Sequence, residues 1–280
     1  MEGNTTQQSD KMDPVVYKFR DINKKMVQCW DSTFSKYKGQ GIEVSCGDIF
    51  QGGPEVDAIV SPANGFGFMD GGIDMVFSRH FGWQMQKRLQ KLLKEEYHGE
   101  LMVGNAVIIP AYEADNPPKP EDIKGCNGEK PIKWLISAPT MRVPLDVSDT
   151  ANAYLAFRGI IIAVQKHNQD PTKEPIKSVL CPGLGTAVGS MDPQICATQM
   201  LNAYESFALG LESAAFRAGP ARLIKMRKDH HGMVNSVNFR AYYPGFIGVP
   251  REVGNLCCMT TMDKLKVEKI NVKEIEKRYC

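Results

Sequence analysis

The amino-acid sequence predicts an α/β fold in three layers, α/β/α, with helices on both faces of a central mixed sheet. Short strand-like runs alternate with longer stretches of helical periodicity along most of the chain, which is the order that α/β folds require. The run at residues 57–61 has an apolar centre, Ala58-Ile59-Val60, as is typical of strands buried on both faces of a sheet. The 280 residues are enough for one large domain or two average ones.

Six stretches have the length and composition of β-strands. Residues 42–46 alternate apolar and polar side chains, so this strand is predicted to be half-buried. Pro62 and Pro110 end the third and fourth runs, since proline cannot continue a strand ladder. In chain order the predicted strands are residues 15–19, 42–46, 57–61, 103–109, 133–138 and 176–181.

Three helices are predicted between or after these strands. Residues 75–97 carry apolar side chains at near-helical spacing, which Gly82 weakens locally, and residues 148–165 form the second helix. The clearest helix starts at Asp192, because an acidic cap followed by proline is a start signal. Apolar residues then recur in steps of four and three over residues 197–211, which places them on one side of the helix.

Composition divides the chain into one large domain and two flanks. Residues 1–14 are polar and are predicted to be a disordered leader. Residues 15–219 hold all the predicted strands, with a surface insertion near residues 114–131 that is rich in proline, glycine and charge. Residues 220–280 are expected to be a C-terminal extension packed on the core, to which the pattern assigns no architecture.

Composition also argues against wholesale disorder and a membrane anchor. Apolar residues make up 42% and charged residues 24%, as in an average globular domain. The strongly apolar stretch at residues 159–164 is far shorter than the ~20 residues of a membrane span, and the polar N-terminus does not resemble a secretory signal. Eight cysteines without a C-x-x-C pair indicate free thiols and offer no metal spacing. We therefore expect an intracellular protein, cytoplasmic or nuclear, with no metal, no cofactor and no membrane partner.

The net charge of +2 is unevenly distributed. Residues 211–280 hold 13 basic and 7 acidic residues, whereas residues 1–210 hold 21 basic and 25 acidic ones. Nucleic-acid binders concentrate positive charge on the structured binding face. Because the part of the chain that carries the motifs is acidic, we do not expect nucleic acid as a partner.

Polar residues and glycines follow three of the predicted strands. Asp48 comes directly after the second strand and Asn64 shortly after the third, at the carboxyl edge where α/β sheets bind ligands. Residues 65–74 contain four glycines between a strand and a helix, and residues 183–190 repeat this arrangement after the last strand. Each segment alone is also typical of an ordinary turn or flexible loop. Together they can present backbone N–H groups to an anion without any Lys or Arg.

The order and spacing of these segments resemble the macro domain family, over roughly residues 42–211. The resemblance implies a macro-domain-like fold and ADP-ribose or a derivative as the ligand. It implies that Asp48 binds the adenine amino group, assisted by the backbone of Ile49, and that Asn64 contacts the distal ribose. Two glycine-rich loops then surround the ribose and the diphosphate. Their implied ligand residues are Gly71, Gly72 and Ile73 in the first loop, and Gly185, Thr186, Ala187, Val188 and Gly189 in the second.

Four residues depart from the usual pattern of the family. Ser61 stands where an asparagine is usual. Asp70 replaces a glycine, which brings a carboxylate close to the diphosphate and either repels it or serves as a catalytic acid or base. Ala187 and Ser190 replace glycines of the second loop, and Ala187 is predicted to strain it because alanine tolerates positive φ poorly.

The resemblance implies two reactions at the distal ribose. One is removal of the phosphate from ADP-ribose-1″-phosphate, and the other is hydrolysis of ADP-ribose from a modified side chain. We expect the phosphatase reaction, since the long insertions resemble fungal macro-domain proteins of that kind. Asn64 is expected to position the ribose, Asp74 to activate a water and Asp70 to act as a second acid.

Two non-enzymatic functions stay open at this point. Many macro domains bind ADP-ribosylated proteins without catalysis, so a modified protein is a second kind of expected partner. Asp70 and Ala187 also fit a structural or regulatory protein whose pocket has decayed. His80, the histidine close to these loops, is either a core histidine of a mostly apolar helix or a proton shuttle.

Overall fold

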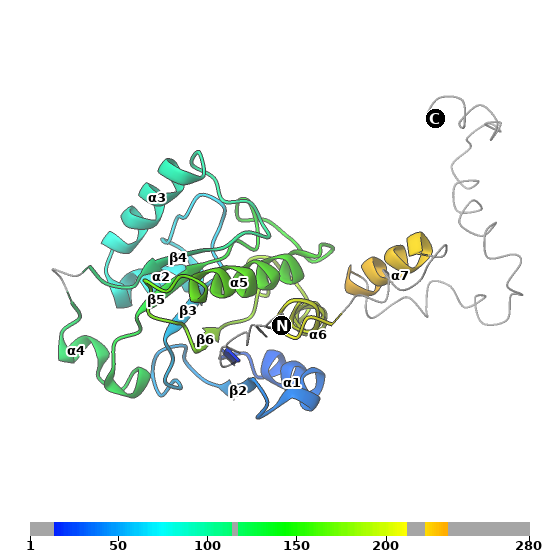
Figure 1. Ribbon diagram of the computed structural model, residues 1–280, viewed down its shortest axis with the longest axis horizontal. Coiled ribbons are helices and arrows are strands. Elements are labelled where there is room, and N and C mark those ends of the chain that lie inside the picture. Colours follow the sequence, from blue (N-terminus) through cyan, green and yellow to red (C-terminus); the bar gives the residue numbers. More distant parts are fainter. Residues whose placement is uncertain (1–13, 114–116, 212–221, 235–280) are drawn as a thin grey trace, which may run out of the picture. The chain divides into compact units, whose positions relative to one another are not determined.

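The computed structural model describes residues 14–113, 117–211 and 222–234, which contain one six-stranded sheet (Figure 1). Its strands lie in the order β2-β1-β6-β3-β5-β4. Neighbouring strands are parallel except for β4, which pairs antiparallel with β5 and makes the sheet mixed. The strands are β1 (Val16–Asp21), β2 (Ile42–Cys46), β3 (Ala58–Ser61), β4 (Val107–Pro110), β5 (Trp134–Ser137) and β6 (Ser178–Cys181).

Helices cover both faces of this sheet, as the sequence predicts. One face packs against α1 (Lys24–Thr33), α5 (Asn152–Asn168) and α6 (Pro193–Ala203). The other face packs against α2 (Gly72–Phe81) and α3 (Gln84–Glu96). Two further helices are α4 (Pro120–Ile123) and α7 (Arg222–Val234). Short 3₁₀ helices lie at Ser35–Tyr37 and Asn127–Glu129, and a π-helical turn follows α6 at Tyr204–Ala208. The three-layer α/β/α prediction is confirmed.

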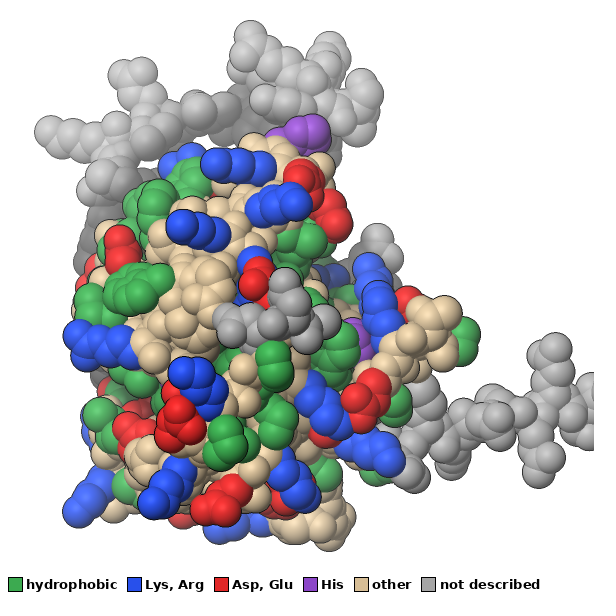
Figure 2. All heavy atoms as spheres, turned by 90° about the vertical axis from the view of Figure 1, so that its left-hand side faces the viewer, with side chains coloured by type: hydrophobic (Ala, Val, Ile, Leu, Met, Phe, Trp, Pro, Cys, Tyr) green, Lys and Arg blue, Asp and Glu red, His purple; other side chains and the backbone are tan. Residues whose placement is uncertain are grey.

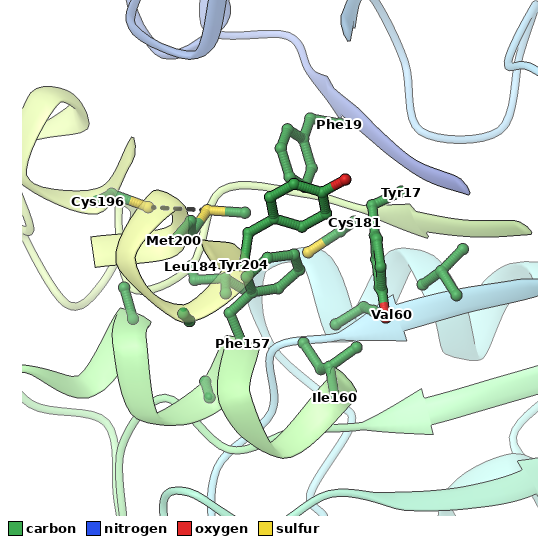
Figure 3. Close-up of a cluster of buried hydrophobic side chains, with 14 of the residues drawn as sticks. Tyr17, Phe19, Val60, Phe157, Ile160, Cys181, Leu184, Cys196, Met200 and Tyr204 are labelled. Carbon is green, nitrogen blue, oxygen red and sulfur yellow. Dashed lines mark hydrogen bonds between the residues drawn. The ribbon is translucent and has the colours of Figure 1, made fainter. Parts of the chain in front are cut away.

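The alternation of strand side chains builds the two halves of the core. Tyr17 and Phe19 of β1 point to the α1, α5 and α6 side, where both rings meet Phe157 of α5 edge-on, at centroid distances of 5.3 and 5.6 Å (Figure 3). On the opposite side, Ile59 of β3 and Leu180 of β6 pack with apolar residues of α2 and α3. Because helices cover both faces of the sheet, a ligand has to bind at the ends of the strands rather than on a face.

The parallel strands bring their carboxyl ends to one edge of the sheet. Five chain segments therefore emerge next to one another, after Asp21, Cys46, Ser61, Ser137 and Cys181. Open α/β sheets bind their ligands at this edge. Asp48, Asn64 and both glycine-rich loops belong to these segments. The fold therefore places the predicted site residues at the carboxyl edge of the sheet.

Several predicted elements differ in the structure. The single helix expected over residues 75–97 is two helices, because Gly82 adopts φ 91° and ψ 152°, a conformation that ends α2. The strand expected over residues 103–109 is confined to β4, and α1 was not predicted at all. A helix, α7, follows residue 221, where the pattern assigned no architecture.

The described part of the insertion near residues 114–131 has local structure of its own. It contains α4 and a buried asparagine, Asn127, whose Oδ1 accepts a hydrogen bond of 2.6 Å from the Val56 N–H. Residues 114–116, the leader at 1–13 and most of the C-terminal extension, 235–280, lie outside the described residues. The predictions for those segments remain predictions.

The molecular surface carries mixed charge where Figure 2 shows it. On that face, Lys and Arg side chains are interspersed with Asp and Glu rather than gathered by sign. None of the helices in the described part of the chain is long and apolar enough to cross a bilayer.

Candidate functional site

A cleft of about 790 Å³ lies at the carboxyl edge of the sheet. Its walls come from the segments after β1, β2, β3, β5 and β6, so stretches as distant as residues 20–23 and 182–188 face the same space. A volume of this size is typical of small-molecule sites. The predicted site residues that line it are Asp48, Ile49, Asn64, Asp70, Gly71, Gly72, Ile73, Asp74, Gly185, Thr186, Ala187 and Val188. Gly189 lies beside the lining rather than in it.

The N-terminus of α2 opens into this cleft without a cap. Gly71, the residue before the helix, has no side chain to offer, and the N–H groups of Gly72 and Ile73 donate to no other described residue. Helices α1 and α6 differ, because Asn23 and Asp192 cap them through side-chain hydrogen bonds. The free amides and the positive end of the helix dipole make the start of α2 suited to an anion.

Most amides of the second glycine-rich loop are also unpaired in the described part of the chain. Within the described residues, no acceptor pairs with the N–H groups of residues 185–189. The carbonyl groups hold the loop instead: Met191 N–H donates to Gly185 O at 3.0 Å, and Val147 N–H donates to Gly189 O at 2.9 Å. Consecutive free amides of this kind form an anion-binding concavity.

The strain predicted at Ala187 is absent. The left-handed positions of this loop are Gly185, at φ 72°, and Ser190, at φ 54°, whereas Ala187 does not have a positive φ. Ala187 is therefore compatible with the loop, because its backbone needs no conformation that a Cβ opposes. Of the two loop replacements that the sequence singles out, Ser190 is the one that occupies a left-handed position.

Asp48 sits on a turn that its own side chain stabilises. Its Oδ1 accepts hydrogen bonds from the N–H groups of Phe50 and Gln51, at 2.9 and 2.8 Å. Its Oδ2 accepts none from the described residues, and the side chain is exposed in the cleft. One carboxylate oxygen is thus available to a donor on a ligand.

Arg20 holds this turn in place and was not predicted. Its guanidinium group is buried and donates to Asp48 O at 2.6 Å, to Ser45 Oγ at 3.0 Å and to Gln51 O at 3.2 Å. Gly47 is needed beside it, because a Cβ at that position would come within 2.4 Å of Nη2. Arg20 has no acidic partner within ion-pair distance in the described part of the chain.

The side chain of Asn64 is engaged by its own loop. Its Nδ2 donates to Phe68 O at 2.8 Å, and its Oδ1 accepts from the N–H groups of Phe66 and Phe68, at 3.1 and 3.3 Å. These bonds shape the start of the loop that leads to α2. The geometry shows this local role directly, while the contact of Asn64 with a ribose stays a prediction.

Asp74 is the buried carboxyl group of the cleft. It lies in the first turn of α2 with 9% of its surface exposed, and Ser61 Oγ donates to its Oδ1 at 2.5 Å. The pKa of Asp74 is raised from 3.8 to about 6: burial has the largest effect and raises it, the hydrogen bond from Ser61 lowers it, and the nearby Asp70 carboxylate raises it. Asp74 therefore exchanges its proton close to neutral pH, as a general acid or base must.

The raised pKa of Asp74 also predicts how stability changes with pH. Between pH 3.8 and about 6 the folded protein holds this proton more tightly than the unfolded chain does. The stabilisation is therefore complete below pH 4 and is lost as the pH rises through 6, by up to about 3 kcal/mol. Urea unfolding from pH 4 to 7.5 should show this loss in the parent and not in Asp74→Asn. Parallel curves for the two proteins would contradict it.

The charges of the cleft are mostly negative. The carboxylates of Asp21, Asp48, Asp70 and Asp74 line it, against the single guanidinium of Arg20 among the described residues. Because Arg20 is already bound to neutral groups of the turn at Asp48, an anionic ligand has to rely on backbone amides. No group of three or more His, Cys, Asp or Glu side chains within the described ranges is placed to hold a metal ion.

His80 does not face the cleft. Its ring stacks on Phe50 at a centroid distance of 3.8 Å, and burial lowers its pKa. Of the two interpretations of this residue, the structure supports a packing role, as a half-buried ring stacked on Phe50, rather than a proton shuttle at the site.

The fold and the cleft define a three-layer α/β protein with an amide-lined pocket at the carboxyl edge of its sheet. The family model of the macro domain matches residues 60–200, half of the chain, and the chain therefore belongs to the macro domain family. An uncharacterized protein of Aquifex aeolicus is 28% identical over 153 residues, which span 55% of this chain and 75% of that protein.

Solved macrodomains are also similar. The macrodomain of Mycobacterium tuberculosis DarG has 22% identity and a TM-score of 0.43, over 58% of this chain and 88% of its own. The Oceanobacillus iheyensis macrodomain with ADP has 19% identity and a TM-score of 0.44, over 59% of this chain and 75% of its own.

Proposed function

We propose that this protein binds ADP-ribose or a derivative in the cleft and hydrolyses it at the distal ribose. The observation that carries the proposal is that two sets of unpaired amides, at the α2 N-terminus and at residues 185–188, line one cleft together with a buried carboxyl group, Asp74. Membership of the macro domain family supports the same ligand. Of the two reactions, we favour removal of the phosphate from ADP-ribose-1″-phosphate over release of ADP-ribose from a protein side chain.

Each part of the ligand has a matching feature in the cleft. The diphosphate takes hydrogen bonds from the amides of the two loops, which supply donors without adding positive side chains. The free Oδ2 of Asp48 suits the amino group of a purine, and the Ile49 backbone lies next to it. Asn64, Gly71 and Gly72 are assigned to the distal ribose in this proposal.

Asp74 supplies the base in this proposal. Because its pKa is about 6, the carboxylate is charged at neutral pH and can take a proton from a water that attacks at the 1″ end. In the favoured reaction the oxygen of this water bonds to phosphorus as the bond between phosphorus and the 1″ oxygen breaks. Inorganic phosphate leaves, and the 1″ oxygen takes up a proton, from solvent or from Asp70 as the second acid, to become the 1″ hydroxyl of ADP-ribose. The uncapped start of α2 stabilises negative charge that develops close by.

Two substrates and one binding measurement test the proposal. The purified protein is incubated with ADP-ribose-1″-phosphate and with a mono-ADP-ribosylated protein, while calorimetry follows binding of ADP-ribose. We expect release of inorganic phosphate from the first substrate and measurable heat with ADP-ribose. Release of ADP-ribose from the modified protein alone would favour the second reaction. Binding without turnover would make the protein a reader of ADP-ribosylation, and no heat at all would indicate a decayed pocket.

Asp70 gives a second, graded prediction about binding. It is exposed in the cleft directly before Gly71, the residue that precedes α2, so its charge opposes a diphosphate held there. Replacement by Asn should tighten ADP-ribose binding about two- to fivefold at low salt, and less at 0.5 M salt, because the repulsion is screened. Glu95→Gln on α3, an exposed charge outside the cleft lining, is the control for net charge. A lower rate with unchanged affinity in Asp70→Asn would instead identify Asp70 as the second acid.

A further inference from the structure

Ser61 is buried beneath the cleft rather than exposed in it. It is the last residue of β3, is fully buried, and does not line the cleft. Its hydroxyl group donates to Oδ1 of Asp74, 13 residues further along the chain, at 2.5 Å. This bond links the end of a central strand to the first turn of the helix whose N-terminus opens on the cleft.

The surroundings of Asp74 make this hydrogen bond important for the carboxylate. Burial opposes its negative charge, and so does Asp70, the charged group that acts on it within the described part of the chain. Ser61 is the side chain that favours the charged form. Without it, a buried carboxylate would have one repulsive neighbour and no side-chain donor to orient it.

A buried serine at this edge of the sheet does not need such a partner in order to fit. Ser137 of β5 lies directly beside Ser61 in the sheet register and is 1% exposed. Its Oγ has no hydrogen-bond partner among the described residues. Two neighbouring serines therefore have the same size and burial, and one of them contacts Asp74.

We propose that Ser61 is a positioning residue for Asp74: its hydroxyl fixes the carboxylate at the wall of the cleft in the orientation and charge state that proton transfer requires. The proposal deepens the proposed function and rests on it for the reaction, but not for the contact itself. In this interpretation the serine that departs from the family's usual asparagine is part of the catalytic arrangement through Asp74.

Ser61→Ala and the matched control Ser137→Ala test the proposal. Both remove one buried hydroxyl from neighbouring positions, so their effects on packing should be similar. The first readout is a carbon-13 NMR titration of the Asp74 carboxyl group, which needs no substrate. Ser61→Ala should raise the pKa of Asp74 above its parent value, because the hydrogen bond that favours the charged form is lost. Ser137→Ala should leave the titration unchanged.

The second readout is the pH profile of hydrolysis. In Ser61→Ala the rate at pH 6 should fall about tenfold, corresponding to one hydrogen bond to a charged group, and should return to within about threefold of the parent at pH 8.5. The KM should not change, since Ser61 does not reach the ligand. A loss of rate that is equal at all pH values would show a merely structural role.

The outcomes separate the two proposals. An unchanged titration of Asp74 in Ser61→Ala, or an equal shift in Ser137→Ala, overturns the role of Ser61 whatever the activity. If the parent turns over neither ADP-ribose compound, the proposed reaction fails. The NMR titration alone then decides whether the Ser61 hydroxyl stabilises the charged form of Asp74.

Discussion

Asp74→Ala should lower the rate of hydrolysis by about 10²- to 10⁴-fold and leave the affinity for ADP-ribose within about threefold. The large effect follows because a carboxylate that takes a proton from water acts in the transition state and contributes little to holding the ligand. In the proposed binding mode, the diphosphate is held by the unpaired amides of the α2 N-terminus and of residues 185–188, which this change does not remove. Single-turnover kinetics and calorimetry on the same preparations measure the two effects separately.

Asp74→Asn is the control for shape in this experiment. It keeps an oxygen that can accept from Ser61 and removes the charge, so it should be as slow as Asp74→Ala. It should also be at least as stable as the parent at pH 7, since the cost of a buried charge is gone. Equal rates in the parent and in both variants would exclude Asp74 as the base.

Gly189→Ala should weaken binding of ADP-ribose by about 10- to 100-fold, the equivalent of one or two lost hydrogen bonds to a charged group. A Cβ at Gly189 would come within 2.5 Å of Gly185 O and 2.6 Å of Val147 Cγ2. The first neighbour is backbone of the same loop, so the loop itself has to move. We expect this movement to change the positions of its unpaired amides, and so to remove hydrogen bonds to the ligand.

Val188→Ala is the matched control, because it alters the same loop without moving its backbone. The Val188 side chain is 60% exposed, and its removal should change the affinity less than twofold. Thermal unfolding should show that both variants remain folded. Binding that falls equally in the two variants would mean that loop side chains, rather than amides, hold the ligand.

The elements that the sequence predicts well are those whose signal is local. Residues 42–46 alternate and form β2 with the predicted bounds, and the Asp192-Pro193 start signal marks the beginning of α6. The glycine-rich loops were found because glycine clusters between a strand and a helix are visible in the chain itself. Helix α1 was missed although Asn23 caps it and Met26 and Trp30 are buried on one side of it. The cap and the apolar spacing were therefore visible in the sequence, but the helix they mark is only ten residues long.

What could not be predicted depends on contacts between distant residues. Arg20 and Asp48 are 28 positions apart and meet because β1 and β2 are neighbours in the sheet, a register that the sequence does not reveal. Ser61 appeared only as a departure from a pattern, since its partner Asp74 is on another element. Ala187 was predicted to strain its loop because the φ of an individual loop residue cannot be read from the residue type.

The place of β1 in the sheet limits how this protein can be shortened. The family match begins at residue 60, yet β1 lies between β2 and β6 and comes from residues 16–21. A truncation that starts at residue 42 would expose the side of β6 that β1 covers and would leave β2 without its partner strand. The same cut would take away Arg20, and with it the support of the turn at Asp48. Domain boundaries for expression or for transplanting this site into another protein should therefore start ahead of residue 16.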